Sequence, residues 1–447
     1  MRSCVAAFVV ALIVVPGRRA VAQDTTVTPS LSLADAVRES LVKTPALRIA
    51  DLQVREAAAR ARQTRAALLP NISAGASWVN QSENLKSFGF EFPLPSGTPP
   101  LPTEIGPFSV FDARASVSQT IFDLAGFKRT AAANAGTKVS ESARDVTGQS
   151  TAQRAAMAYL EAARAAAMVV ARTEDVKLAS DLAGLAQAQL DAGVSTALDV
   201  TRAKTQLAAA RGALLVAQNA QQQADIGLAR ALGLSPSQRF SLTDTLSSAL
   251  GVSAAPTDVR AAVDTALARR PELKVERERA RRAELERAAA NAEYLPRLDV
   301  AADWGYNGPP SSDIIATRRI AVAVTVPILD GFRREGRAAE EGAAVEEARV
   351  REHDLTQQVE ADVEGAALDL QSARQQESVA SEQLGLAEEE LRQARDRFTG
   401  GIAGNIDVIN AQMALVHARD AVINARYGAA AARVHLARAT GVAETVH

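Results

Sequence analysis

The sequence predicts a mainly α-helical fold that consists of long helical hairpins with four β-strands added to them. Two stretches, residues 125–190 and 333–397, contain no proline and little glycine, and they are rich in alanine, glutamate, glutamine and arginine. Four shorter segments alternate apolar and polar residues, a pattern that is typical of strands. The whole series occurs twice along the 447 residues, so we expect an internal duplication rather than a short-period repeat array.

The composition argues against several classes of protein. A net charge of −2 and a pI of about 6.2 give no indication of a nucleic-acid partner. Hydrophobic residues make up 47% of the chain but aromatic residues only 4%, and alanine is by far the commonest of the others, which favours helices in close contact. The chain has one cysteine, Cys4, so no disulfide can form within it.

The first residues have the features of a secretory signal. Arg2 is a short positive segment, residues 4–15 are apolar, and residues 20–22 (Ala-Val-Ala) form a small-x-small cleavage site. The apolar run is too short to span a bilayer, and a short membrane anchor is the alternative interpretation. We expect residues 1–22 to be removed on export. No later apolar run reaches membrane-spanning length, so insertion into a membrane would have to use strands.

The duplication is visible as landmarks that recur at one spacing. Pro45 and Pro271 lie 226 residues apart, and so do the only two tryptophans, Trp78 and Trp304. Further along the chain the spacing falls to 208, because a loop in the first half is longer. The expected parts are the signal peptide at residues 1–22, a first repeat at 23–233, a linker at 234–258, a second repeat at 259–441 and a tail at 442–447.

Each repeat is expected to open with a helix and to continue with two strands. In the first repeat Ser32 can cap a helix over residues 34–68 that is interrupted at Pro45. Leu69-Pro70 ends this helix, because proline cannot continue the hydrogen-bond ladder. Beyond this point the alternation predicts strands over about 70–80 and 108–121 in the first repeat and over about 296–306 and 318–329 in the second.

Each predicted strand has one apolar and one polar face. Such strands suit either a soluble sheet that covers a core or a membrane barrel with lipid outside and water inside. Their length, about ten residues, is what a tilted barrel strand needs to cross a bilayer. Trp78, Trp304 and Tyr306 fall near strand ends, where an aromatic girdle would lie. The export signal and the duplication favour the barrel, and since four strands cannot close one, two, three or four chains must combine.

The long helical stretches follow the second strand of each repeat. At about 1.5 Å per residue, a helix over residues 125–190 would be roughly 100 Å long, which no compact domain needs. Glycine-containing breaks then lead into a second long helix in each repeat, because glycine permits the left-handed turn of a helix end. We therefore expect two helical hairpins per chain, with exposed tips near residues 192–199 and 400–407.

Taken together, these elements resemble the TolC family of outer-membrane efflux proteins. The resemblance rests on the duplicated order of elements, on the strand-to-helix motifs at residues 118–123 and 326–331, and on the tip motifs at residues 192–200 and 400–408. It implies a homotrimer in the outer membrane, with a twelve-stranded β-barrel in the lipid and a helical tunnel in the periplasm. It also implies a passive duct without cofactor, which exports substrates together with a periplasmic adaptor and an inner-membrane pump of the RND, ABC or MFS type, in multidrug efflux or type I secretion.

The resemblance also assigns residues to sites. The expected adaptor contacts at the tips are Gly193, Val194, Ser195, Leu198, Gly401, Ile402 and Ile406. The expected periplasmic gate comprises Asp199, Phe398, Asp407 and Asn410. The family has an aspartate in place of Asn410, a tyrosine in place of Phe398 and an arginine in place of Ala403, so we expect a different or weaker closed-state latch. Helix N-capping is an equal alternative for Asp199 and Asp407, since each follows a turn and opens a helix.

The sequence gives no support to an enzyme. The four histidines, His353, His417, His435 and His447, show no metal-ligand spacing, and no nucleophile elbow, phosphate loop or CxxC motif occurs. The carboxylates lie on helices among arginines, which indicates solvated charge. The remaining alternative to a duct is a secreted trimeric coiled-coil spacer, which would share the long helices and the export signal but would not need paired two-faced strands.

Overall fold

The computed structural model describes residues 29–89, 97, 103–246, 258–310, 314–400, 402 and 404–445. The predicted signal peptide lies outside the described residues, as do Gly401, Ala403, residues 247–257 of the linker and the last two residues of the tail. Within the described part of the chain, no helix combines the length and the apolar composition that crossing a membrane requires.

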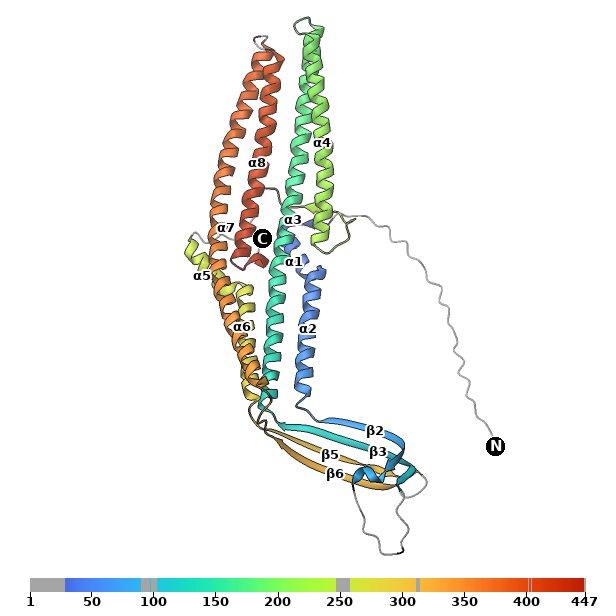
Figure 1. Ribbon diagram of the computed structural model, residues 1–447. Helices are drawn as coiled ribbons and strands as arrows, with labels where there is room; N and C mark the ends of the chain where they lie inside the picture. The colour runs from blue at the N-terminus through green and yellow to red at the C-terminus, as the bar shows by residue number, and fades with distance from the viewer. Residues whose placement is uncertain are drawn as a thin grey trace, which may run out of the picture.

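Two helices run the length of the molecule, from a β-sheet at one end to the hairpin tips at the other (Figure 1). These are α3 (Leu124–Asp191) and α7 (Arg333–Thr399), of 68 and 67 residues. Two further helices, α4 (Ala197–Ala231) and α8 (Asn405–Ala439), return beside their tip-proximal halves and complete the two hairpins. Each long helix buries residues against neighbouring helices rather than in a globular core, α3 mainly against α4 and α7 mainly against α8.

Each repeat opens with a pair of helices that meets at a proline. The first pair is α1 (Leu33–Lys43) and α2 (Pro45–Ala66), and the second is α5 (Val259–Arg269) and α6 (Pro271–Ala292). The break expected at Pro45 therefore divides the opening segment into two helices. Proline occupies the first helical position in both cases, where its missing N–H costs nothing. The Ser32 hydroxyl caps α1 as expected, because it accepts a hydrogen bond from the Asp35 N–H.

The sheet contains four antiparallel strands in the order β2-β3-β5-β6. Their bounds are Asn71–Asn84 for β2, Glu104–Phe122 for β3, Arg297–Gly308 for β5 and Ile315–Thr325 for β6. β2 and β3 extend beyond the expected residues 70–80 and 108–121, because their pairing resumes after a bulge near Gln81. β6 ends at Thr325, not at about residue 329, since Pro327 cannot donate to a ladder.

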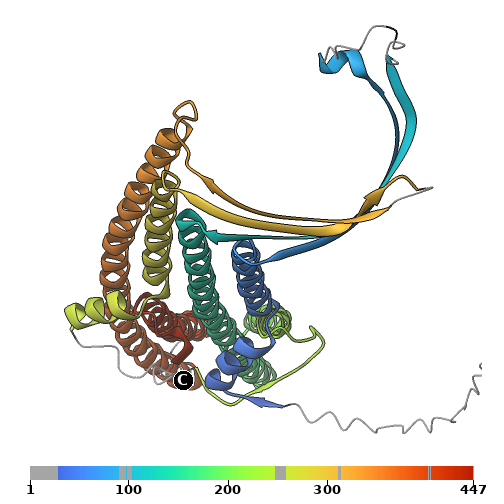
Figure 2. The ribbon, with the colours of Figure 1, turned by 90° about the horizontal axis from the view of Figure 1, so that it is seen from below.

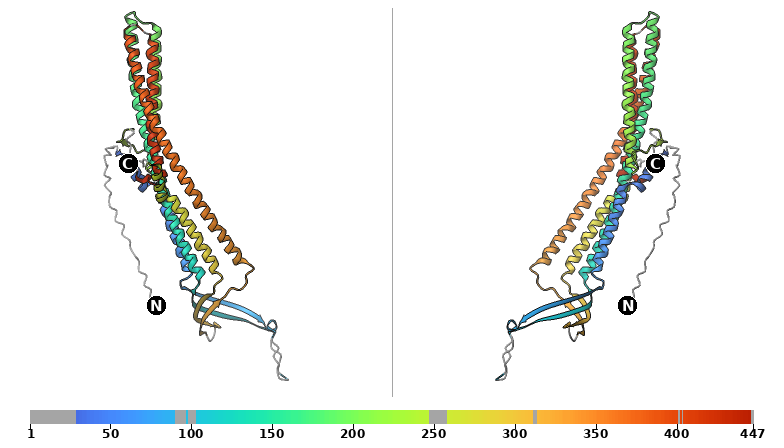
Figure 3. Two further views of the ribbon diagram at one scale, coloured as in Figure 1. Left: turned by 90° about the vertical axis from the view of Figure 1, so that its left-hand side faces the viewer. Right: turned by 90° about the vertical axis from the view of Figure 1, so that its right-hand side faces the viewer.

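The wall formed by the helices and the sheet is curved. Figure 2, a view from the sheet end, shows α2, α3, α6 and α7 in a row that bends in the same sense as the strands. Figure 3 shows the sheet projecting sideways from the end of the helical part. Among the strands that the structure describes, β2 and β6 each have one hydrogen-bonded neighbour, which leaves the outer edge of each open. An open edge with unpaired N–H and C=O groups is a site for pairing with another chain.

The waist of the molecule contains the largest apolar cluster, which joins both repeats. Short strands β1 (Ser30–Leu31) and β4 (Ser241–Leu242) pair there in parallel, beside alanines of α3 and α8. A short 3-10 helix, Ala443–Thr445, follows α8 here, and its Ala443 belongs to the cluster. The other described 3-10 helix, Leu85–Phe88, follows β2 in the sheet region. Tyr159 of α3 is fully buried in this cluster, and its hydroxyl lies 2.9 Å from Asp244 Oδ2 and 3.1 Å from Leu31 O. Burial raises the pKa of the Tyr159 hydroxyl, which therefore keeps its proton and donates it.

Replacing Tyr159 by phenylalanine should destabilise the waist by about 1–2 kcal/mol, because the acceptors that the hydroxyl serves become buried with fewer partners. Thermal unfolding followed by circular dichroism measures the effect. Tyr306→Phe, at an exposed ring in the sheet, is the matched control and should leave the midpoint unchanged. Equal midpoints for both variants would show that the Tyr159 hydroxyl contributes nothing to the waist.

Candidate functional site

The two hairpin tips lie side by side at the end of the molecule opposite the sheet (Figure 1). One apolar cluster, here called the tip cluster, draws on all four hairpin helices. Its buried members are Leu182, Ala183, Ala186, Val200, Ala203, Ala387, Leu391, Phe398, Val408, Ile409, Ala411, Leu415 and Ala418. Phe398 is 5% exposed, so the predicted gate residue lies inside this cluster, where its ring helps to hold the two hairpins together.

The first tip is closed by a capping box. Thr196 is the N-cap of α4, and its hydroxyl and N–H both donate to Asp199 Oδ2, at 2.7 Å and 3.3 Å. The Ser195 hydroxyl donates to the same oxygen at 3.2 Å, and Gly193 supplies the left-handed turn with a φ of 74°. The Thr196 hydroxyl therefore holds the pKa of the Asp199 carboxyl below its usual range. Asp199 takes part in capping, but from the third helical position rather than from the cap itself.

The second tip lacks this arrangement. Gly404 is the N-cap of α8 and offers no side chain, and Asp407 occupies the position that corresponds to Asp199. The Asp407 carboxylate is exposed and has no hydrogen-bond or ion-pair partner among the described residues. Asn410, one turn further on, is also exposed. The capping interpretation is thus wrong for Asp407, because the capping hydroxyl present in the first tip is absent from the second.

Two amide side chains connect the hairpins at the tips. Asn405, the first residue of α8, is 1% exposed, and its Nδ2 donates to the Asp199 carbonyl oxygen at 3.0 Å. Gln189 Nε2 makes a longer contact of 3.5 Å with the Phe398 carbonyl oxygen. The sequence did not predict either amide as a site residue, since an asparagine or glutamine near a helix end is normally exposed to water. The structure therefore joins α4 to α8 at the residue predicted as a gate, through its backbone rather than its carboxylate.

The tips present apolar side chains to solvent. Val194 and Ile402 are 75% and 76% exposed, and Leu198 and Ile406 are also exposed. Four exposed aliphatic side chains therefore lie on the turns and helix starts at this end of the molecule. Of the expected contact residues, Gly401 lies outside the described part of the chain, and the others occupy the two turns and the helix starts that follow them.

A buried ion-pair network, absent from the sequence-based expectations, joins the hairpins between the waist and the tips. Asp175 of α3 has a side chain that is 4% exposed, and each of its oxygens accepts a hydrogen bond from an arginine at 2.9 Å. These arginines are Arg172 of α3 and Arg419 of α8, and Arg172 also pairs with Asp420 at 2.5 Å. Two cations and two anions thus balance at the seam between α3 and α8.

The register of the sheet places most of the apolar residues on one face and the ion-paired residues on the other. Ile72 faces Val117 and Trp78 faces Phe111 across β2 and β3, which places apolar residues together as the alternation predicts. On the opposite face, Asp112, Arg114, Asp303 and Arg319 form a chain of ion pairs across β3, β5 and β6 at 2.6–2.9 Å. One face therefore suits lipid or a core, and the other suits water.

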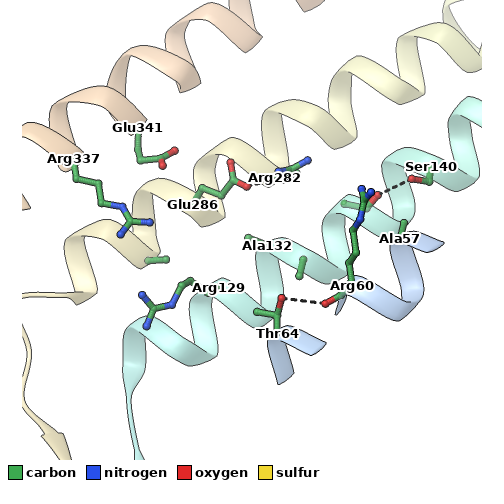
Figure 4. Close-up of a pocket in the computed structure, with 13 residues that line it drawn as sticks. Ala57, Arg60, Thr64, Arg129, Ala132, Ser140, Arg282, Glu286, Arg337 and Glu341 are labelled. Atoms are coloured by element: carbon green, nitrogen blue, oxygen red, sulfur yellow. Dashed lines mark hydrogen bonds and ion pairs between the residues drawn. The ribbon is translucent and has the colours of Figure 1, made fainter. Parts of the chain in front are cut away.

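A groove of about 440 Å³ lies between α2, α3, α6 and α7 near the sheet (Figure 4). Its charged lining consists of Arg60, Arg129, Arg282, Glu286, Arg337 and Glu341. Arg282 pairs with Glu286 at 2.8 Å, and Arg337 and Arg129 both reach Glu293. Burial and the nearby Glu286 raise the pKa of the Glu341 carboxyl. The groove has the ion-paired character of a helix seam, and no described group of three His, Cys, Asp or Glu residues could hold a metal ion.

Comparisons with known proteins match this architecture. The outer membrane efflux protein family matches residues 36–234 and 262–442, so both repeats are covered. The outer membrane efflux protein BepC of Brucella suis is 25% identical over 309 residues, which are 66% of this chain. The matched region spans 63% of the length of BepC.

Two solved structures share the fold over nearly the whole chain. The outer membrane protein VceC of Vibrio cholerae is 21% identical, with 92% of this chain and 96% of VceC covered and a TM-score of 0.75. The open state of the MtrE outer membrane channel of Neisseria gonorrhoeae is 18% identical, with 92% and 89% covered and a TM-score of 0.76. At these identities the similarity concerns the arrangement of the helices and strands.

Proposed function

Because the chain belongs to the outer membrane efflux protein family, we propose that three copies assemble into a passive duct through which substrates leave the cell. The main support for this assembly is the sheet, which has one apolar and one charged face and open edges at β2 and β6. In lipid, unpaired backbone groups at such edges cost several kcal/mol each, so the edge of one chain must pair with the edge of the next. Three sheets give twelve strands, with the apolar face toward lipid and the charged face toward water.

The family places the chain in the outer membrane with its helical part in the periplasm. We propose that the hairpins of three chains continue the barrel as a tunnel, and that a periplasmic adaptor linked to an inner-membrane pump docks on the tips. The exposed Val194, Leu198, Ile402 and Ile406 support this docking site. The secreted spacer is not supported, because a spacer needs neither the strand pairs nor the match to this family.

We propose that the gate lies at the tips and includes Asp199, Phe398, Asp407 and Asn410. Phe398 and the Asn405 amide hold the two hairpins of one chain together, whereas the exposed Asp407 and Asn410 are free to face the neighbouring chains. Three unpaired Asp407 carboxylates around one axis would repel one another and attract cations. The ionised Asp199, occupied by its own capping box, contributes mainly to the shape of the turn.

The duct is tested with the mature protein purified from outer membranes. Heat-modified mobility on gels and ion conductance in planar bilayers should show a trimeric pore. Deletion of β2, β3, β5 and β6 should release a helical protein that no longer fractionates with the outer membrane. A deletion variant that still does so would mean that the strands are not the anchor.

Ile402→Glu should lower export at least about tenfold while trimers and conductance persist, because a buried unpaired carboxylate in an apolar contact costs several kcal/mol. Export is measured as accumulation of a fluorescent dye in cells that lack the chromosomal copy. Ile402→Leu, which keeps the apolar surface, should export normally. Normal export by Ile402→Glu would remove this side chain from the docking surface.

A further inference from the structure

The sheet contains four arginines, and three of them follow a common rule. Arg114, Arg297 and Arg319 lie on the charged face, and each has a carboxylate partner. The distances are 2.8 Å from Arg114 to Asp303, 2.8 Å from Arg297 to Asp299, and 2.9 Å from Arg319 to Asp303. On this face the positive charges are therefore neutralised within the chain.

Arg318 is the exception. It stands directly opposite Trp304 in the β5–β6 ladder, and residues that face each other across a ladder share one side of the sheet, so Arg318 lies on the apolar face. It is exposed, and no described carboxylate forms an ion pair with it. Beside it, the rings of Trp304 and Tyr306 meet edge to face with centroids 5.3 Å apart, and both rings are exposed.

The position along the strand matters as much as the face. Arg318 is the fourth residue of β6, which begins at Ile315, at the end of the sheet far from the helices. In the proposed barrel this is the outer end of the strand. An arginine on the lipid face is strongly unfavourable at the bilayer midplane but nearly neutral close to the interface. Tryptophan and tyrosine also prefer the headgroup level. The three side chains thus fit together where headgroups lie.

We propose that Arg318, with Trp304 and Tyr306, binds a phosphate group of a lipid headgroup in the outer leaflet, an inference that rests on the proposed barrel. A guanidinium presents paired N–H donors that match the oxygens of a phosphate, and such charge-assisted pairs are among the strongest hydrogen bonds. The two rings would cover the adjoining apolar and sugar parts of the lipid. A lipid phosphate would then neutralise Arg318, whereas carboxylates of the chain itself neutralise Arg114, Arg297 and Arg319.

Lipid binding to purified trimers can be measured by native mass spectrometry in detergent, with bisphosphorylated lipid A as the probe. Arg318→Gln should weaken lipid A binding at least about tenfold. Arg318→Lys should bind lipid A with intermediate strength, since lysine keeps the positive charge but lacks the paired N–H donors of a guanidinium. Arg319→Gln is the matched control on the adjacent residue of the other face and should bind like the unmodified protein. Phosphate-free lipid A should bind weakly to all four proteins.

Three results would overturn the assignment. Unchanged lipid A binding by Arg318→Gln would remove the arginine from the site, and equal binding of phosphate-free lipid A would remove the phosphate. Dissociation of the Arg318→Gln trimers would identify Arg318 as a contact between chains. Planar-bilayer conductance separates this inference from the duct itself: a protein that forms no pores contradicts the proposed function, whereas normal pores with unchanged lipid binding contradict only the lipid site.

Discussion

Replacement of Gly305 by alanine is expected to reduce the yield of heat-resistant trimers at least about tenfold. A β-carbon at this position would lie 2.3 Å from Arg114 Cβ and 2.4 Å from the Ala113 carbonyl oxygen. Neither the β-carbon nor the backbone of β3 can rotate away, so β5 would have to separate from β3 in the middle of the sheet. Overpacking typically costs about 1–3 kcal/mol, and each 1.4 kcal/mol is about a factor of ten. Gel mobility with and without heating gives the yield.

Gly75 is a control for this substitution within the same ladder. Gly75 and Gly305 face Arg114 from β2 and β5, on either side of the same residue. A β-carbon on Gly75 would meet nothing within 4 Å, so Gly75→Ala should assemble normally. If both variants assemble equally well, the close approach of β3 and β5 does not limit assembly; if both fail, any change beside Arg114 is harmful and the steric argument is wrong.

Replacement of Asp175 by asparagine is expected to destabilise the helical part by about 3–5 kcal/mol, the usual cost of removing one partner from a buried ion pair. Arg419 would lose the carboxylate that it contacts at 2.9 Å, and Arg172 would keep only Asp420. Chemical unfolding followed by circular dichroism measures the loss. Limited proteolysis should also cut the hairpins sooner, since the network joins α3 to α8 where the waist and tip clusters end.

Two further variants make this prediction specific. Glu174→Gln changes the neighbouring, exposed carboxylate and should have little effect on stability. The double variant Asp175→Asn with Arg419→Gln should recover part of the loss, because no half-buried guanidinium is then left without its carboxylate. If the stability lost in the double variant equals the sum of the losses measured for Asp175→Asn and Arg419→Gln separately, the two residues are not coupled.

Much of the fold could be predicted from local patterns. The proline-free stretches indicated helices that begin and end within a few residues of the observed α3 and α7. Pro45 and Pro271 marked the breaks in the opening helices. The strand faces followed from alternation alone. The lengths of β2 and β3 were underestimated, because a strand continues wherever its neighbour offers hydrogen bonds, and the sequence of one strand does not show where its neighbour ends.

The candidate site was less accessible to such reasoning. Asp199 and Asp407 occupy equivalent places in the duplication, yet Thr196 binds the first, whereas Gly404 has no side chain and no other described residue binds the second. Asn405 and Asp175 were not expected to matter, since asparagine and aspartate on an alanine-rich helix normally face water. Each is buried by the other repeat: Asn405 reaches a partner 206 residues away, and Arg419 reaches Asp175 across 244 residues.

By itself the sequence determined the duplication, the helices and their breaks, and which face of each strand is apolar, because these features depend on periods of two or 3.6 residues and on proline and glycine. Only the tertiary structure decided the strand ends, the burial of Phe398, Asn405 and Asp175, and the isolation of Arg318 from every described carboxylate. The physical reason is that burial and charge pairing depend on which distant segments meet. Two halves with the same pattern therefore differ in the contacts that hold them together.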